Sequence, residues 1–337
     1  MSKLLSVIIV SYNTQDLTIK SLESLIADIR TSDLLKNDTE IFVVDNHSQD
    51  DSVSAIKKFF SKVKFADYQL IVNQKNLGFA RANNQALKKA SGQYLLLLNS
   101  DTVVKKGACE TLVKTFIDVP DELVTAATQD SDKIIDYLGI LSPTLLNPDG
   151  SLQPQGGSSL SLLAVFNQMF FLDDLPLIGK HLPSTQQTGR SRHLSREKLQ
   201  LKQNQQHQLI PKAWVAGTAM MIRKDLITRI GYLDPNIFMY GEDQEFCLRA
   251  KHHHFDIAVH PQAEVMHWGS ASSSSKSAIL GEFQSYLYIW KKHFPAYQLR
   301  ILRWILRAGA GIRVLFYRLT GNRRQATIYL EALKIIK

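Results

Sequence analysis

The stretch SVIIVSYNT, Ser6 to Thr14, is a short β-branched run that ends in polar residues. Three runs of the same kind, EIFVVD, QLIVN and YLLLLN, follow within the first 105 residues. Apolar runs of this length are typical of parallel strands buried on both faces. The segments between them carry apolar residues at helical spacing, as at Leu22, Leu25 and Ile29. We therefore predict an α/β fold with a mainly parallel central sheet wound by helices.

Polar residues stand where three of these predicted strands end. In a parallel sheet, ligands bind at the carboxyl ends of the strands, so this is the arrangement that a nucleotide site needs. Asn and Asp also favour turns and helix caps, and this preference can explain any one of these residues. It explains less well why polar residues follow three predicted strands in succession. The residues are Tyr12, Asn13, Asp45, Asn46, Asn99 and Asp101.

No glycine-rich phosphate loop follows the first predicted strand. The sequence there is SYNTQDLTIK, which matches neither G-x-G-x-x-G nor a Walker loop and so argues against a Rossmann dehydrogenase and a P-loop NTPase. A carboxylate at a strand end, such as Asp101, can instead hold a divalent cation that neutralises a diphosphate. The pattern indicates a phosphate site built in that way.

Composition limits the class of protein and its compartment. A chain of 337 residues with 45% hydrophobic residues can bury a sizeable core. Its two cysteines, Cys109 and Cys247, cannot build a disulfide framework, which fits a reducing compartment. The first apolar run is followed at once by polar residues, with no small-residue cleavage site, so we interpret it as a buried strand. We expect a cytoplasmic protein.

The net charge of +9 is concentrated near the C-terminus. From Lys291 onward there are eleven Lys or Arg and one acid, Glu331, so this segment carries +10 and the remainder about −1. A basic segment raises the question of nucleic-acid binding. No zinc-finger spacing, helix-turn-helix pattern or aromatic RNA-binding signature accompanies it, so we expect no nucleic-acid partner.

Residues 295–337 form a predicted basic amphipathic helical segment. Arg300, Arg303 and Arg307 fall on one helical face, and arginines interrupt the apolar residues too often for a bilayer-spanning helix. Two interpretations stay open. The segment binds an anionic membrane surface, at the inner face of the cytoplasmic membrane, or it packs on its own domain or on a second subunit of a homo-oligomer.

The middle of the chain is less regular. NPDG, Asn147 to Gly150, predicts a hairpin turn, and AWVAGTAMMI, from Ala213, predicts a strand followed by a short helix that ends at Gly231. Residues 183–208 are rich in Gln, Ser, Arg and His, which favours a mobile loop. Such a loop is either a lid over a substrate or a surface insertion.

Six motifs occur together in one order over residues 4–271. They are SVIIVSYNT, VVDNHSQDDS, NLGFARANNQAL, LLLLNSDT, WVAGTAMMIRKDLITRIGYLDPNIFMYGEDQEFCLR and HWGSAS. In this order and at these separations they resemble the inverting, GT-A-fold glycosyltransferases of family 2, and within them the rhamnosyltransferase-like members. The resemblance implies a domain over 1–270, with a nucleotide-sugar-binding half at 1–105 and an acceptor half at 106–270. Residues 271–337 would be a helical extension.

The resemblance implies a donor site in the first half. Asp45 corresponds to the acid that accepts a hydrogen bond from N3–H of a uracil or thymine base, and Ser11 and Tyr12 line the base and ribose. The family's donor segment N-x-G-F falls on this chain as well, although a capped glycine turn before a helix has the same sequence. The matching residues are Asn76, Gly78, Phe79 and Asn84.

The family's D-x-D site falls on Asn99, Ser100 and Asp101, with Asn in place of the first Asp. Only Asp101 remains as a charged ligand, so the resemblance implies that it holds Mg²⁺ or Mn²⁺ together with the diphosphate, water and His267. Oxygen-rich sites suit both ions. A histidine beside Trp268, taken alone, is more often a packing residue.

The stretch FMYGEDQEFCLRAK contains adjacent acids, Glu242 and Asp243, at a predicted helix start. Acids are common in a first helical turn, so the stretch alone does not identify a base. In the family's E-D motif the second acid is the base, which points to Asp243, with Glu242 supporting it or orienting the acceptor. Arg249 would order the site or the diphosphate. Trp214 and Gly217 would lie on the acceptor side, although aromatic residues on strands are usually core.

These expectations combine into one predicted activity. The chain would move a sugar, with L-rhamnose suggested by the rhamnosyltransferase-like members, from a dTDP- or UDP-sugar to a polysaccharide or lipid-linked saccharide acceptor. Inverting transfer is a single displacement and needs one base, unlike the carboxylate pair of a hydrolase. The alternative is a nucleotide-sugar-binding or scaffolding protein of the same fold without catalysis, suggested by the NSD departure.

Overall fold

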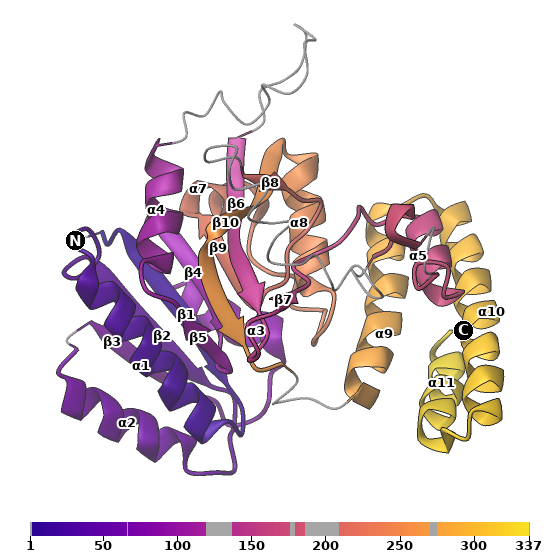
Figure 1. The fold of residues 1–337 in the computed structure, drawn as a ribbon, viewed down its shortest axis with the longest axis horizontal. Helices are drawn as coiled ribbons and strands as arrows, with labels where there is room; N and C mark the ends of the chain where they lie inside the picture. Colours follow the sequence, from indigo (N-terminus) through magenta and orange to yellow (C-terminus); the bar gives the residue numbers. More distant parts are fainter. Residues whose placement is uncertain are drawn as a thin grey trace, which may run out of the picture.

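The computed structural model describes residues 2–65, 67–118, 137–175, 179–185, 209–269 and 275–336. These form one ten-stranded sheet flanked by helices, and a cluster of helices lies beside it (Figure 1). Along the main path the strand order is β3-β2-β1-β4-β9-β6-β10-β5. The predicted α/β fold is therefore confirmed.

The first half of the sheet is parallel, as the apolar runs predicted. Strand β1 (Leu5–Ser11) lies between β2 (Thr39–Asp45) and β4 (Tyr94–Asn99), and β3 (Tyr68–Val72) adds to β2. Because all four strands point the same way, the residues that follow β1, β2 and β4 meet at one edge of the sheet.

Helices cover both faces of this parallel half, so its strands are apolar throughout. Along β1, Leu5, Val7 and Ile9 pack with one set of helices and Ile8 with another, and all four are fully buried. Alternation of this kind follows from the two-residue period of a strand. Helices α1 (Gln15–Thr31) and α2 (Ser52–Val63) lie on the first face, and α3 (Phe79–Leu87) lies on the second. Helices α4 (Ala108–Asp118) and α8 (Glu242–His252) belong to the same two cores but contact β10, in the second half of the sheet.

The second half of the sheet mixes directions. Strand β9 (Ala219–Arg223) is antiparallel to β4 and to β6 (Tyr137–Leu146), and β10 (Phe255–His267) is parallel to β6. The strand predicted from Ala213 begins only at Ala219, because the residues before it form a loop at the edge of the cavity described below.

Strand β10 places its last residue beside the end of β4. The short strand β5 (Thr102–Val104) follows β4 and pairs antiparallel with β10, with His267 opposite Thr102. Residues 165 positions apart in the chain, Thr102 and His267, are thereby brought together.

Shorter elements complete the domain. The NPDG turn joins β6 to β7 (Leu152–Gln153) in an antiparallel pair, as predicted, and β8 (Ile210–Pro211) pairs with β10. Helix α7 (Lys224–Ile230) ends at Gly231, also as predicted, and a 3-10 turn spans Gly179–His181. Of the loop predicted at 183–208, residues 186–208 lie outside the described residues.

The helix cluster contains three C-terminal helices and one from the middle of the chain. Helices α9 (Ser275–His293), α10 (Ala296–Leu319) and α11 (Arg323–Ile335) share a hydrophobic core with α5 (Leu162–Met169). Gly309 of α10 allows close approach to α5, because a Cβ there would stand 2.6 Å from the Met169 Cβ. Across the described ranges, none of the helices is long and apolar enough to cross a bilayer.

Candidate active site

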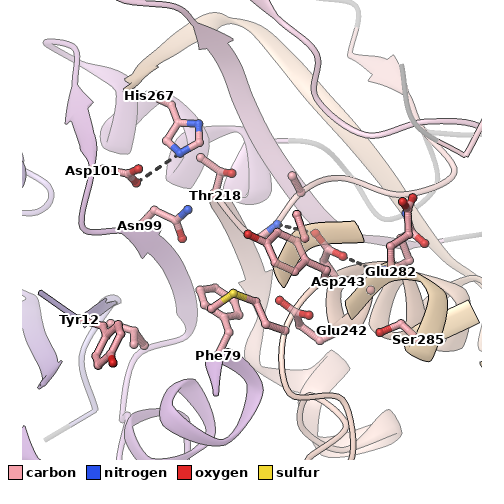
Figure 2. Close-up of a pocket in the computed structure, with 18 of the residues that line it drawn as sticks. Tyr12, Phe79, Asn99, Asp101, Thr218, Glu242, Asp243, His267, Glu282 and Ser285 are labelled. Atoms are coloured by element: carbon pink, nitrogen blue, oxygen red, sulfur yellow. Dashed lines mark hydrogen bonds and ion pairs between the residues drawn. The ribbon is translucent and has the colours of Figure 1, made fainter. Parts of the chain in front are cut away.

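A cavity of about 470 Å³ lies at the carboxyl ends of β1 and β4, where the strand-end residues were predicted to meet. The loop before β9, the start of α8 and one side of α9 form its remaining walls. Figure 2 shows polar side chains from all these elements facing one space. The predicted site residues in its wall are Tyr12, Asn76, Phe79, Asn99, Ser100, Asp101, Trp214, Gly217, Glu242, Asp243 and His267.

Asp101 and His267 stand together at one end of this cavity (Figure 2). The His267 Nε2 atom lies 3.2 Å from the Asp101 Oδ1 atom. Trp268 donates its backbone N–H to the Asp101 carbonyl, which fixes the two residues to one another through the β5–β10 pairing. The structure therefore brings together the two residues predicted to bind a metal.

Gln153 sets the orientation of the His267 ring. Asn147 Nδ2 donates to the Leu152 carbonyl, so its Oδ1 faces Gln153 and accepts from Gln153 Nε2 at 3.1 Å. The Gln153 Oε1 atom is then left for His267 Nδ1, 2.7 Å away, which makes Nδ1 the protonated nitrogen. Nε2, the nitrogen beside Asp101, is the one that a metal or a second proton would occupy.

The Asp101–His267 pair fits a divalent cation shared with a substrate. A carboxylate and an imidazole are suitable ligands for Mn²⁺, and Mg²⁺ is usually held by one or two carboxylates with substrate phosphates and water. Within the described ranges no third His, Cys, Asp or Glu joins the pair. A cation bound here would take its other ligands from a diphosphate and from water.

The carboxylate pair sits at the start of α8, on the cavity wall. Gly241, with φ of 113°, precedes Glu242 in a backbone conformation that glycine adopts readily. Asp243 accepts two backbone hydrogen bonds, at 3.1 Å from Gly217 N and 2.8 Å from Gln244 N. The Glu242 Oε2 atom is buried and has no hydrogen-bond partner among the described residues.

These two environments give the neighbouring acids different protonation. Burial, and secondarily the charge of Asp243, raise the pKa of Glu242 to about 8. Burial also raises the pKa of Asp243, but the N–H groups of Gly217 and Gln244 oppose that rise by stabilising its carboxylate. Asp243 is therefore the acid that ionises first, while Glu242 keeps its proton at neutral pH.

The N-x-G-F segment connects the two halves of the site. Asn76 accepts hydrogen bonds from Asn46 Nδ2 and Gly78 N, each at 2.9 Å. A Cβ at Gly78 would stand 2.3 Å from the Phe238 carbonyl oxygen, and Phe79 N donates to that same oxygen. Only glycine fits there, so this segment is fixed against the loop that leads into Glu242.

Ser11 and Asp45 lie behind the cavity wall. Ser11 is fully buried and its hydroxyl is hydrogen-bonded to Thr18 Oγ1 at 2.9 Å. Asp45 accepts from Ser48 N through Oδ1, and its Oδ2 atom is buried with no partner in the described chain. Asp45 thus has a free acceptor where a base N–H was predicted, whereas Ser11 has a local partner.

Asn84 and Arg249 are two further predicted donor residues that do not line this cavity. Asn84 makes two hydrogen bonds to the backbone of Leu233, at 2.8 and 3.1 Å, and so fastens α3 to the loop after α7. Arg249 binds Glu245 at 2.9 Å and donates to the carbonyls of Ile230 and Tyr232. Both side chains hold loops in place through hydrogen bonds to backbone groups, and the sequence alone does not predict this role.

Sequence reasoning missed the contribution of the C-terminal helices. Glu282, Ser285 and Tyr286 of α9 line the cavity, as does Thr218 from the loop before β9 (Figure 2 labels Thr218, Glu282 and Ser285). Gln153, which holds His267, was also missed. Thr218 lies within the motif that begins at Trp214 but was not singled out, and Gln153 and the three residues of α9 lie outside the six motifs.

The first two fifths of the chain resemble a known protein family. The family model described as glycosyl transferase family 2 matches residues 6–139, which include the cavity wall at the ends of β1 and β4. Residues 6–139 are therefore similar to a glycosyl transferase family 2 domain. The family 2 domain accounts for the parallel half of the sheet, and the motifs Glu242–Asp243 and His267 lie beyond it.

Two curated relatives extend the similarity past the family 2 domain. The low-salt glycan biosynthesis hexosyltransferase Agl10 of Haloferax volcanii is 26% identical over 267 residues, 78% of this chain. The chain spans 66% of the length of Agl10. An N-acetylglucosaminyl-diphospho-decaprenol L-rhamnosyltransferase of Mycobacterium tuberculosis is 22% identical over 282 residues, covering 81% of each protein.

Solved structures show the same fold. The structure of GalNAc-T7 with UDP, GalNAc and Mn²⁺ superposes with a TM-score of 0.58 and 16% identity. The match covers 88% of this chain and 49% of that one. The arrangement of strands and helices is therefore the GT-A fold, with C-terminal helices added.

Proposed function

We propose that this chain is an inverting glycosyltransferase that uses a dTDP- or UDP-sugar. The observation that carries the proposal is that the Asp101–His267 pair and the Glu242–Asp243 pair line one cavity at the carboxyl edge of the sheet. The first pair suits a diphosphate-bound cation, and the second offers one ionised and one protonated acid. Nucleotide-sugar transfer requires both functions in a single site.

Asp243 would act as the general base. It accepts the proton of an acceptor hydroxyl as that oxygen forms a bond to the anomeric carbon. The bond from the anomeric carbon to the diphosphate breaks at the same time, and the nucleoside diphosphate leaves with the electron pair. Attack opposite to the leaving group inverts the anomeric centre. The two N–H donors on Asp243 fix its carboxylate for this transfer.

Asp45 would select the nucleotide base. Its buried, unpartnered Oδ2 atom is an acceptor for the imide N–H of uracil or thymine, and cytosine offers no hydrogen at that position. The relative that uses L-rhamnose supports a rhamnose donor, and the GalNAc-T7 structure contains UDP. The name of the L-rhamnosyltransferase contains a lipid-linked saccharide, N-acetylglucosaminyl-diphospho-decaprenol, which supports a saccharide or lipid-linked saccharide as the acceptor of this chain.

Asp101 and His267 would hold Mg²⁺ or Mn²⁺, with Gln153 keeping the His267 Nε2 atom turned toward Asp101. A bound divalent cation would neutralise the charge that develops on the departing diphosphate. The GalNAc-T7 structure holds Mn²⁺, which supports a metal-dependent donor site in this chain.

A thermal-shift panel of UDP, dTDP, GDP and CDP, each with and without Mn²⁺, tests this proposal. UDP or dTDP should raise the melting temperature, and Mn²⁺ should increase that rise. Both contributions follow because binding to the native state alone stabilises it. A preference for GDP, or no stabilisation by any nucleotide, would contradict the proposed donor.

A peripheral membrane position would bring the enzyme to a lipid-linked acceptor. Helix α10 exposes an apolar stripe at helical spacing, in which Trp304 is 63% and Leu319 is 79% exposed. Arg300, Arg307 and Arg318 are also exposed on this helix. Apolar side chains flanked by arginine suit the surface of an anionic bilayer. The stripe comprises Tyr297, Ile301, Trp304, Ile312, Leu315 and Leu319.

A further inference from the structure

We infer that α9 supplies the binding site for the acceptor sugar, through Glu282 and Ser285, which line the cavity beyond Glu242 and Asp243. The inference rests on the proposed glycosyl transfer and names a part of the site that the family 2 domain does not contain. Figure 2 shows Asp101 and His267 at one end, Glu242 and Asp243 in the middle, and Glu282 and Ser285 beyond them. An acceptor must approach Asp243 from the side away from the diphosphate.

Helix α9 is packed directly on the loop that carries the carboxylate pair. A Cβ at Gly241 would stand 2.6 Å from the Ser285 Cβ. A Cβ at Gly281 of α9 would stand 2.8 Å from the Met239 carbonyl oxygen. Glycine at both contact points thus lets the helix approach the loop to the distance at which its side chains reach the cavity.

Glu282 is held in position by its neighbours. Its Oε1 atom accepts hydrogen bonds from Gln168 Nε2 and from the Tyr286 hydroxyl, each at 2.9 Å. The Gln168 Oε1 atom lies 3.0 Å from the same hydroxyl oxygen, and this cluster of polar groups ties α5 to α9 behind the cavity. A carboxyl group fixed in this way needs no reordering when a ligand binds.

The chemistry of this wall fits a saccharide. Sugar hydroxyls donate to carboxylates and exchange hydrogen bonds with hydroxyls, which Glu282 and the buried Ser285 supply. Glu242 is only 6% exposed, and its buried Oε2 atom lacks a partner in the described structure, so a hydrogen bond from a ligand would satisfy it. Ala278 and Ile279 give the same wall an apolar surface for the sugar ring.

Binding of p-nitrophenyl pyranosides, measured by saturation-transfer NMR, tests the inference. The panel contains the glucoside, galactoside, mannoside, rhamnoside and N-acetylglucosaminide, with and without dTDP or UDP and Mn²⁺. At least one should bind, and Glu282→Gln and Ser285→Ala should each weaken it about tenfold, as expected for a hydrogen bond to a charged or buried group. Lys291→Gln, at an exposed position of α9, is the matched control and should change nothing.

Nucleotide-induced stabilisation is measured on the same variants. It should remain unchanged in Glu282→Gln, because that residue lies away from the diphosphate end. A pyranoside that binds Glu282→Gln and Ser285→Ala as it binds the unmodified chain would overturn the inference. Failure of every pyranoside to bind, with nucleotide binding intact, would also overturn it. Loss of nucleotide stabilisation in the unmodified chain would instead contradict the proposed function.

Discussion

Glu242 and Asp243 are neighbours in sequence, yet their surroundings assign them different protonation. Asp243 receives two backbone N–H groups, whereas the Oε2 atom of Glu242 is buried without a partner in the described chain. The sequence FMYGEDQEF cannot show this difference, because Gly217 reaches Asp243 only through the folding of a distant loop. The different surroundings of the two acids thus arise from the tertiary structure.

Replacing Glu242 by Gln should make stability less dependent on pH. The pKa of Glu242 is raised in the folded state to about 8, so its proton stabilises the fold at low pH. That stability is lost as pH rises from the unfolded pKa near 4.5 through about 8, at up to about 1.4 kcal/mol per pH unit. Unfolding by urea at pH 5.5 and pH 8.5 measures it.

The variant should gain stability over the unmodified chain mainly at pH 8.5. Asp256→Asn, which removes an acid paired with Lys251 at a distance from the cavity, serves as the control. If Glu242→Gln and the unmodified chain lose equal stability between the two pH values, Glu242 is not protonated as described.

At the scale of residues, the motifs predicted where a side chain lies in the fold better than they predicted whether it faces the cavity. Asp101, His267 and the carboxylate pair could be predicted to share a site because their motifs flank strand ends and a helix start. Asn84 and Arg249 have equally suggestive motifs, but each is engaged by backbone carbonyls of a loop. Whether a polar side chain faces a ligand or a loop depends on packing between distant segments, which a single sequence does not contain.

At the scale of elements, the pairing of β5 with β10 builds the end of the cavity that contains Asp101 and His267. Asp101 precedes β5 and His267 ends β10, and the register places His267 opposite Thr102. The apolar runs predicted the four parallel strands, because buried strands need continuous apolar sequence. They did not predict this antiparallel pair, since β5 has only three residues and its partner lies far along the chain.

Asp101→Asn should abolish the metal-dependent part of nucleotide binding. The neutral amide is a weaker ligand for a hard cation, so Mn²⁺ should no longer increase the stabilisation given by UDP or dTDP. Thermal shifts with nucleotide alone and with nucleotide plus Mn²⁺ provide the measurement. An undiminished Mn²⁺ increment would place the metal elsewhere.

Gln153→Leu should weaken the same increment while leaving the Asp101 carboxylate in place. Loss of the Gln153 acceptor frees His267 to rotate or change tautomer, and outer-shell partners of this kind typically change metal affinity 10- to 100-fold. Titration of Mn²⁺ by electron paramagnetic resonance in the presence of UDP or dTDP measures the affinity. Gln153→Glu, which restores an acceptor for Nδ1, should recover most of it. Equal affinity in all three proteins would remove Gln153 from the site.

On the scale of the whole molecule, the C-terminal helices join the catalytic domain on one side and expose an apolar stripe on another. Helix α9 lines the cavity, and α10 and α11 share its core with α5 (Figure 1). Removing the residues after Pro295 would therefore expose this core. Point substitutions on the exposed stripe are the appropriate test of membrane binding.

Trp304→Ser combined with Leu315→Ser should reduce binding to vesicles that contain anionic lipid. Both side chains are more than half exposed, so the folded core is not altered. Each substitution removes an apolar side chain whose full burial is worth about 1.5–3 kcal/mol, which corresponds to a loss of tenfold or more in affinity for the vesicles. Co-sedimentation with vesicles of phosphatidylglycerol and phosphatidylcholine measures this.

Thr327→Ala, at an exposed position of α11, is the control for that experiment. Unaltered vesicle binding by the double variant would leave the stripe without a role in membranes. A change from dimer to monomer in the double variant, without any vesicle binding by the unmodified chain, would assign the stripe to contact between copies.

The measurement that tests the central claim most directly compares Asp243→Asn with the unmodified chain. Release of nucleoside diphosphate from dTDP-rhamnose and from UDP-sugars is followed with a bacterial lipid extract as the source of acceptors, and nucleotide binding is measured by calorimetry. Asp243→Asn should lower turnover by about 10²–10⁴-fold while dTDP or UDP binds with unchanged affinity, because only the base is lost. Turnover equal to that of the unmodified chain would contradict the assignment of Asp243 as the base of a glycosyl transfer.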